Sequence, residues 1–162
     1  MSSKLLIKGG KIIDPVDNTI LEKDILCEDN KIIDIAENIQ VLDEYSIIDA
    51  KGKYVAPGLV DVHVHFRDPG FEYKEDILTG AKAAARGGFT SVVLMANTSP
   101  AVDNEDTVKY ILDKGAKTDI NVYTCGTVTM GMAGETMVDM DKLMDARVVG
   151  FTDDGKPIMD EE

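Results

Sequence analysis

The sequence predicts an α/β protein, an incomplete (β/α)8 TIM-type barrel of about four βα units that follows a small all-β domain. Two observations carry this prediction. Short apolar runs with little room for helices fill residues 1–57, whereas strand-like and helix-like segments alternate over residues 58–162. Such alternation is typical of parallel βαβ units. The change of pattern at Ala56-Pro57-Gly58 marks the predicted boundary between the domains.

The first region is predicted to contain strands alone. Turn formers such as Gly9-Gly10 and Asp29-Asn30 separate its apolar runs. The connections are short, which favours a small antiparallel sheet or half-sandwich. The predicted strands cover residues 5–8, 11–14, 24–28, 31–35, 46–49 and 54–55.

The second region is predicted to alternate four buried strands with three helices. Gly87-Gly88 is a natural stop for the first helix, and Asp103 or Asn104 a cap for the second. Met137, Met140 and Met144 recur at helical spacing, which predicts one buried face of the third helix. The strands are expected at 59–65, 90–95, 120–125 and 148–152, and the helices at about 75–86, 104–115 and 137–145.

Polar residues follow each of the four predicted strands, as at the active face of a (β/α)8 barrel. A full barrel takes roughly 250 residues, and 105 residues follow Pro57. The sequence therefore predicts about half a barrel. An open half-barrel exposes a strand edge, so we expect a homo-oligomer or another association through that edge.

Composition narrows the class of partner. The formal charge is −13, with 44% hydrophobic and 29% charged residues, so nucleic acid and anionic membranes are not expected as partners. Two cysteines make no disulfide framework, and no apolar run has the length of a signal peptide or membrane span. We predict a cytoplasmic protein.

The two histidines of the chain, His63 and His65, are expected to bind a metal ion. They lie one residue apart near the end of an apolar strand. Side chains alternate between the faces of a strand, so both imidazoles and Asp61 share one face. Two imidazoles about 6–7 Å apart can converge on one cation. Asp61 is expected to be a structural partner rather than a ligand.

A carboxylate from the fourth strand end would complete a His/His/carboxylate set. Asp153 or Asp154 can point inward, and the other then turns outward or orients a ligand; a plain turn is the alternative. Arg67 suits capture of a substrate carboxylate, although an isolated arginine is usually a surface residue. Asn97 can donate and accept hydrogen bonds, or simply precede a turn.

Several of these segments resemble dihydroorotases of the amidohydrolase superfamily. Residues 61–70 (DVHVHFRDPG) resemble the family signature, and residues 95–100 and 151–155 resemble its second and fourth strand ends. Residues 5–57 are similar to the β-domain that accompanies the barrel. Ala96 stands where the family usually has proline.

The resemblance implies a zinc enzyme with two Zn²⁺ ions per active site. His63 and His65 would bind one of these ions. Asp154, a ligand in the catalytic site, would bridge the two ions. His65, Arg67 and Asn97 would contact the substrate. The implied reaction is the reversible hydrolysis of dihydroorotate to N-carbamoyl-L-aspartate in pyrimidine biosynthesis. Family members also use further histidines and a catalytic aspartate that this sequence lacks, so residues 1–162 alone are expected to be inactive.

Two alternatives stay open at this point. Hydantoinases and allantoinases cleave other cyclic amides or ureides on the same scaffold. A non-catalytic scaffold or partner subunit is the alternative from another class.

Overall fold

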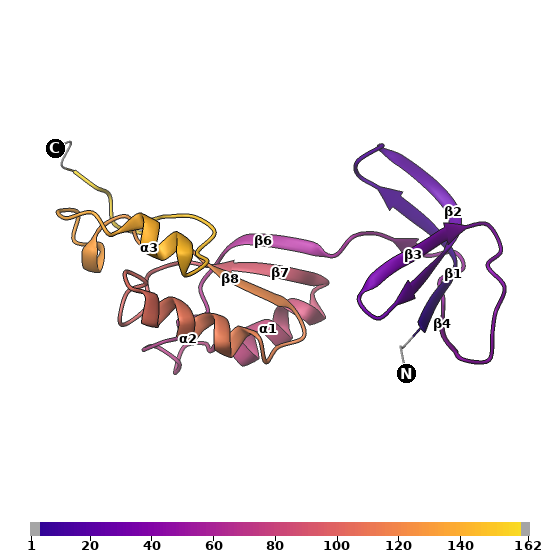
Figure 1. The fold of residues 1–162 in the computed structure, drawn as a ribbon, viewed down its shortest axis with the longest axis horizontal. Helices are drawn as coiled ribbons and strands as arrows, with labels where there is room; N and C mark the ends of the chain where they lie inside the picture. Colours follow the sequence, from indigo (N-terminus) through magenta and orange to yellow (C-terminus); the bar gives the residue numbers. More distant parts are fainter. Residues whose placement is uncertain (1–3, 160–162) are drawn as a thin grey trace. The chain divides into compact units, whose positions relative to one another are not determined.

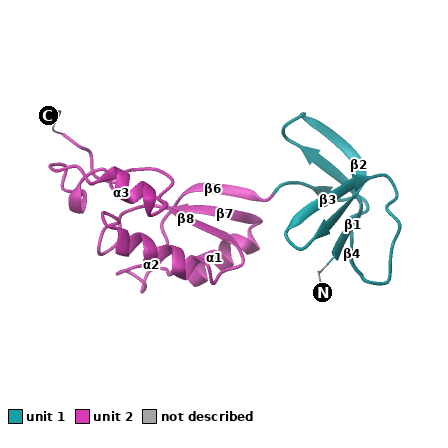
Figure 2. Cartoon of the chain, in the orientation of Figure 1, with its two compact units in different colours: residues 1–57 teal, residues 58–162 magenta. Residues whose placement is uncertain are grey.

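A computed structural model describes residues 4–159, which belong to two compact units. Unit 1 comprises residues 1–57 and unit 2 residues 58–162 (Figure 2). None of the helices in the described part of the chain has the length and apolar character needed to cross a membrane.

Unit 1 is a five-stranded mixed sheet. The strand order is β3-β2-β1-β4, and β5 also pairs with β1. The β1/β2 and β2/β3 pairs are antiparallel, but β4 and β5 run parallel to β1. The prediction of a small antiparallel sheet is therefore confirmed for β1–β3 and wrong for β4 and β5, because residues 37–44 carry the chain across to the far side of β1. The strands are β1 (Lys4–Asp14), β2 (Thr19–Glu28), β3 (Lys31–Ala36), β4 (Tyr45–Asp49) and β5 (Tyr54–Val55) (Figure 1).

The Gly9-Gly10 pair forms a bulge within one long strand and not the predicted turn between two strands. Ile7 pairs with Ile25 and Gly10 with Lys23, so two residues of β1 face the single residue Asp24. Gly9 has a φ of 70°, a conformation that glycine adopts without steric cost. The bulge bends β1 without ending it.

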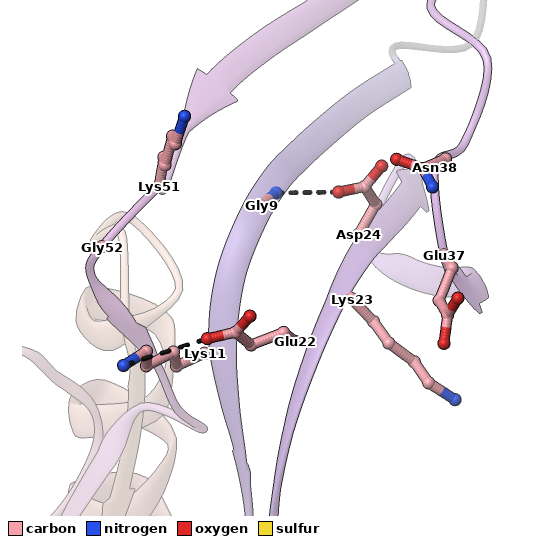
Figure 3. A pocket seen from close by; sticks show the side chains of 9 residues that line it. All are labelled: Gly9, Lys11, Glu22, Lys23, Asp24, Glu37, Asn38, Lys51 and Gly52. Atoms are coloured by element: carbon pink, nitrogen blue, oxygen red, sulfur yellow. Dashed lines mark hydrogen bonds and ion pairs between the residues drawn. The ribbon is translucent and has the colours of Figure 1, made fainter.

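The buried carboxylate of Asp24 holds this bulge together. It accepts hydrogen bonds from the Gly9 N–H (2.7 Å), the Ile39 N–H (2.9 Å) and Lys8 Nζ (3.0 Å). Figure 3 shows the bond between Gly9 and Asp24. Burial opposes ionisation of Asp24, but these bonds outweigh it and hold the pKa below its ordinary value.

We expect Asp24→Asn to lower the free energy of unfolding of unit 1 by about 2 kcal/mol at neutral pH, because charge-assisted bonds are lost and donors stay buried. A carboxyl group with a depressed pKa stabilises the fold above its unfolded pKa. That stabilisation disappears as pH falls through the folded pKa. Urea unfolding between pH 3 and 7 would show a shallower acid limb in the variant. The exposed Asp17→Asn serves as control, and equal acid limbs in all three proteins would contradict the prediction.

The cavity drawn in Figure 3 lies beside this bulge and measures about 530 Å³. Both acidic and basic side chains line it, and Lys11 pairs with Glu22 at 3.9 Å. Its buried carboxylate, Asp24, already has its partners. The cavity is lined by Gly9, Lys11, Glu22, Lys23, Asp24, Glu37, Asn38, Lys51 and Gly52.

Unit 2 is built on a parallel three-stranded sheet in the order β6-β7-β8. Helices connect these strands and cover one face of the sheet (Figure 1). The predicted alternation of strands and helices is therefore confirmed over the first three strands. The elements are β6 (Leu59–Val64), α1 (Ile77–Arg86), β7 (Phe89–Leu94), α2 (Glu105–Gly115), β8 (Asn121–Thr124), the 3-10 turn η1 (Met130–Met132) and α3 (Met140–Asp145).

The first strand of this sheet is less buried than predicted. Leu59, Val60 and Val62 are exposed, Val62 to 67%. β6 is the edge strand of this sheet, and only Val64 and Phe66, at and just beyond its end, pack against the hydrophobic core. Gly80 of α1 allows this contact, since a Cβ there would lie 2.6 Å from the Phe66 ring.

Two predictions near the C-terminal end of the described residues are wrong. Residues 148–152 form no regular strand, only an isolated parallel bridge between Phe151 and Gly126, because β8 ends after four residues. The third helix begins at Met140, where Asp139 caps it. Met137 therefore lies outside the helix, and both Met137 and Met144 are exposed, whereas Leu143 is buried.

Candidate metal centre

The ends of β6 and β7 lie side by side and bring His65 next to Asn97. Val64 pairs with Leu94, and the N–H of Met95, the residue that follows β7, donates to the Val64 carbonyl (2.9 Å). The residues that follow each strand therefore meet at the same edge of the sheet. Across this edge, His65 Nδ1 lies 3.0 Å from Asn97 Oδ1.

His63, His65 and Asp154 form a compact group of possible ligands. Both Nε2 atoms lie 3.4 Å from Asp154 Oδ2, and the three donor atoms all lie within 4.8 Å of one another. The ring centroids are 5.2 Å apart, with the rings inclined at 65°. The histidine pair thus converges on the carboxylate from the far end of unit 2.

These separations fit a small divalent cation. Zinc binds nitrogen and oxygen ligands at about 2.0–2.2 Å, so ligand atoms in a tetrahedral site lie about 3.4 Å apart. The two distances of 3.4 Å to Asp154 match that spacing. They are longer than ordinary N–H···O hydrogen bonds of about 2.7–3.2 Å. Two imidazoles and one carboxylate are also a donor set that zinc prefers.

The two aspartates left open by the sequence have different surroundings. Asp153 is buried and accepts bonds from the backbone N–H groups of Val128 (2.8 Å) and Thr129 (3.3 Å) and from Thr129 Oγ1 (2.5 Å). Asp154 faces the histidines instead. The carboxylate of Asp153 thereby ties residues 128–129 to the chain immediately before Asp154.

Backbone bonds place this segment although it is no regular strand. The Val149 N–H donates to the Thr124 carbonyl (3.0 Å), and the Thr152 N–H donates to the Gly126 carbonyl (2.9 Å). Residues 149–152 therefore continue the parallel pattern beyond β8. This contact brings Asp154 to the edge of the sheet that carries the histidines.

Asp61 lies outside the ligand group. Its Oδ1 accepts a bond from the backbone N–H of His63 (3.0 Å). This contact supports the backbone of a candidate ligand, as expected of a structural partner.

Arg67 belongs to the loop that follows the histidines. Its φ is 62° and its side chain is half-buried. Within residues 4–159 the guanidinium has no hydrogen-bond or ion-pair partner, so its donors are available to a ligand. The loop also approaches the Asn97 loop closely, because the Ser99 N–H donates to the Pro69 carbonyl (3.0 Å). A Cβ on Gly70 would lie 2.2 Å from the Ser99 carbonyl oxygen.

The sequence analysis missed a buried network that holds this loop. Asp68, immediately after Arg67, is fully buried. Its carboxylate pairs with Lys114 Nζ (2.5 Å) and accepts bonds from Tyr110 Oη (2.9 Å) and the Ile77 N–H (3.1 Å). Burial lowers the pKa of Lys114, but its bonds to Asp68 and Tyr110 outweigh this effect and raise the pKa overall. The spacing of Tyr110 and Lys114, which puts both residues on one face of α2, was the feature of the sequence that could have indicated this network.

Comparison with known proteins finds one family whose members match the chain closely in sequence. Residues 52–161 match the family described as Dihydro-orotase-like. Dihydroorotases of Clostridioides difficile and Clostridium acetobutylicum are 55% and 51% identical over 96% of the chain. The chain spans 37% of the length of each of these relatives.

A solved structure is also similar. The L-hydantoinase (dihydropyrimidinase) of Arthrobacter aurescens matches 93% of the chain with a TM-score of 0.76 and 26% identity, over 32% of its own chain. This likeness confirms the predicted fold class, part of a (β/α)8 barrel after a small all-β unit. The chain belongs to the dihydroorotase-like family, the family that its motifs resemble.

Proposed function

We propose that this chain is part of a zinc-dependent dihydroorotase. The enzyme would reversibly hydrolyse the ring amide of dihydroorotate to N-carbamoyl-L-aspartate, in pyrimidine biosynthesis in the cytoplasm. The observation that carries this proposal is the His63/His65/Asp154 group, with its 3.4 Å separations, in a chain about half identical to dihydroorotases. Because the chain spans 37% of those relatives, the activity is proposed for the whole protein.

The three candidate ligands have distinct tasks in this proposal. His63 and His65 offer their Nε2 lone pairs, and the Asp154 carboxylate supplies negative charge opposite them. A bound zinc ion supplies Lewis acidity, which activates water and polarises an amide carbonyl. A second ion, as the family resemblance implies, would share Asp154 and require ligands from outside this chain.

Arg67 and Asn97 would orient the substrate. The unpartnered guanidinium of Arg67 is planar and suits a carboxylate that accepts two parallel bonds. Asn97, on the neighbouring loop, adds an amide beside His65. Holding the substrate acid at two points would place the ring amide against the metal centre in one orientation.

A hydantoinase is the second candidate, because the solved structure with a TM-score of 0.76 is an L-hydantoinase. Hydantoin itself carries no carboxylate, so Arg67 would have no acid to bind. This difference favours dihydroorotate and also provides the means of testing the assignment.

The test compares dihydroorotate with hydantoin in the whole protein, loaded with zinc. We expect dihydroorotate to give the higher kcat/KM. Arg67→Lys keeps the charge but loses the two-point geometry, and we expect it to lower kcat/KM for dihydroorotate by about 10–100-fold, the equivalent of one or two charge-assisted bonds. Hydantoin turnover should change much less.

Two controls accompany the assay. His63→Ala should abolish turnover of both substrates, and the 162-residue chain alone should show no turnover above that variant. Faster turnover of hydantoin, or an equal effect of Arg67→Lys on both substrates, would contradict the dihydroorotase assignment. A zinc-free chain that forms a defined oligomer would favour a scaffold protein.

A further inference from the structure

The two ring nitrogens of His65 have different neighbours. Nε2 faces Asp154 Oδ2 at 3.4 Å, within the candidate metal centre. Nδ1, on the other edge of the ring, lies 3.0 Å from Oδ1 of Asn97. The 3.0 Å distance is that of an ordinary hydrogen bond. Asn97 is therefore engaged with a candidate metal ligand, in addition to the substrate contact proposed above.

The chemistry of the site settles which nitrogen carries the proton when metal is bound. Nε2 is the nitrogen that would hold a metal ion at this centre, because that atom faces Asp154. The neutral imidazole then holds its hydrogen on Nδ1. Only an acceptor can satisfy that N–H group, and the carbonyl oxygen of Asn97 is in place. We propose that Asn97 is a positioning residue, which fixes the tautomer and ring orientation of His65 and so raises the affinity of the centre for zinc.

His63 provides a natural contrast. Its side chain is 53% exposed, and that of His65 29%. Within residues 4–159, the ring of His63 faces Asp154 and makes a ring contact with His65, and its Nδ1 has no hydrogen-bond partner. Only one of the two histidines of the candidate centre is therefore hydrogen-bonded through the Nδ1 atom.

The bond to His65 also determines what Asn97 offers a substrate. With one lone pair of Oδ1 engaged by His65, the Nδ2 hydrogens are the donors that the amide offers to a substrate. A carboxylate, which accepts hydrogen bonds, suits them. The loop that holds Asn97 is itself braced, because the N–H groups of Thr98 (3.0 Å) and Val102 (3.1 Å) donate to the Ala96 carbonyl. The same amide thus connects the metal ligand with the substrate.

The proposal rests on the proposed metal centre and is tested with zinc on the 162-residue chain. Asn97→Leu keeps the size of the side chain but removes the acceptor. We expect it to weaken zinc binding by about 10–100-fold, the usual effect of losing a partner of a metal-bound histidine. Asn97→Asp retains an acceptor oxygen and should bind zinc at least as tightly as the wild type. Thr98→Val, on the same loop, should change the affinity less than twofold.

An imidazole ¹H–¹⁵N spectrum of the zinc-loaded chain gives a second readout, independent of activity. The Nδ1 proton of His65 should be protected from exchange in the wild type and in Asn97→Asp, and lost in Asn97→Leu. The Nδ1 proton of His63 should exchange rapidly in all three proteins. Equal zinc affinity and an unchanged His65 signal in Asn97→Leu would overturn the positioning role alone. Absence of zinc binding by the wild type would overturn the metal centre and this role together.

Discussion

Asp68→Ala is expected to lower the free energy of unfolding of unit 2 by about 3 kcal/mol, among the largest effects of any single substitution in this chain. Asp68 is fully buried, and its carboxylate partners Lys114, Tyr110 and the first N–H of α1. Alanine leaves the Lys114 ammonium without its counter-charge in a site where its side chain is only 23% exposed. Urea unfolding followed by circular dichroism measures the loss.

A second substitution distinguishes this cause from a simple loss of packing. Lys114→Met removes the orphaned charge and keeps most of the aliphatic stem. We therefore expect the double variant Asp68→Ala/Lys114→Met to be more stable than Asp68→Ala alone. Asp119→Ala, an exposed aspartate of the same unit, should leave stability unchanged. Strictly additive costs of the two substitutions would contradict the ion-pair explanation.

The network around Asp68 was invisible in the sequence because it joins distant segments. Asp68 follows β6, whereas Tyr110 and Lys114 lie 42 and 46 positions later on α2. Local periodicity correctly predicted α1, α2 and the parallel strands β6, β7 and β8. It contained no information about which buried carboxylate would face which cation.

Local pattern also failed where tertiary pairing decides the structure. Gly9-Gly10 has the composition of a turn, yet Asp24 of the next strand satisfies the bulge and lets β1 continue. Met137 and Met144 have helical spacing, but the Asp139 cap starts α3 later and directs Leu143 inward. In both cases a side-chain bond that the periodicity could not reveal overrides the expected pattern.

Local pattern likewise predicted one part of the candidate site, the histidine pair, and left another part, the aspartate, open. The one-residue spacing of His63 and His65 was enough to predict that the two rings lie close together, because alternation along a strand is a local property. The choice between Asp153 and Asp154 was open in the sequence, since both follow the predicted strand at 148–152 and either could point inward. In the structure, Asp153 accepts bonds from the N–H groups of Val128 and Thr129, whereas Asp154 faces the histidines, and this difference supports the proposal of Asp154 as the ligand.

The different surroundings of Asp153 and Asp154 lead to a second prediction, in which substitutions of the two residues have large and opposite effects on zinc binding and stability. Asp154→Ala should weaken zinc binding by more than the roughly 10–100-fold that loss of a ligand's partner costs, because a ligand itself is lost. It should leave the free energy of unfolding of the metal-free chain nearly unchanged, since Asp154 accepts no backbone hydrogen bond among residues 4–159. Zinc titration and urea unfolding of the same samples measure the two quantities.

Asp153→Ala should behave in the opposite manner. It leaves the buried N–H groups of Val128 and Thr129 without acceptors, and we expect a loss of about 2–3 kcal/mol in the free energy of unfolding of unit 2. Zinc affinity should fall less than in Asp154→Ala, because the ligand remains and only its support is removed. A variant pair with the effects exchanged would assign the metal to Asp153. Two variants that lose stability and affinity together would mean that the Asp-Asp-Gly segment acts as one structural turn, and the metal centre would then have only its two histidines.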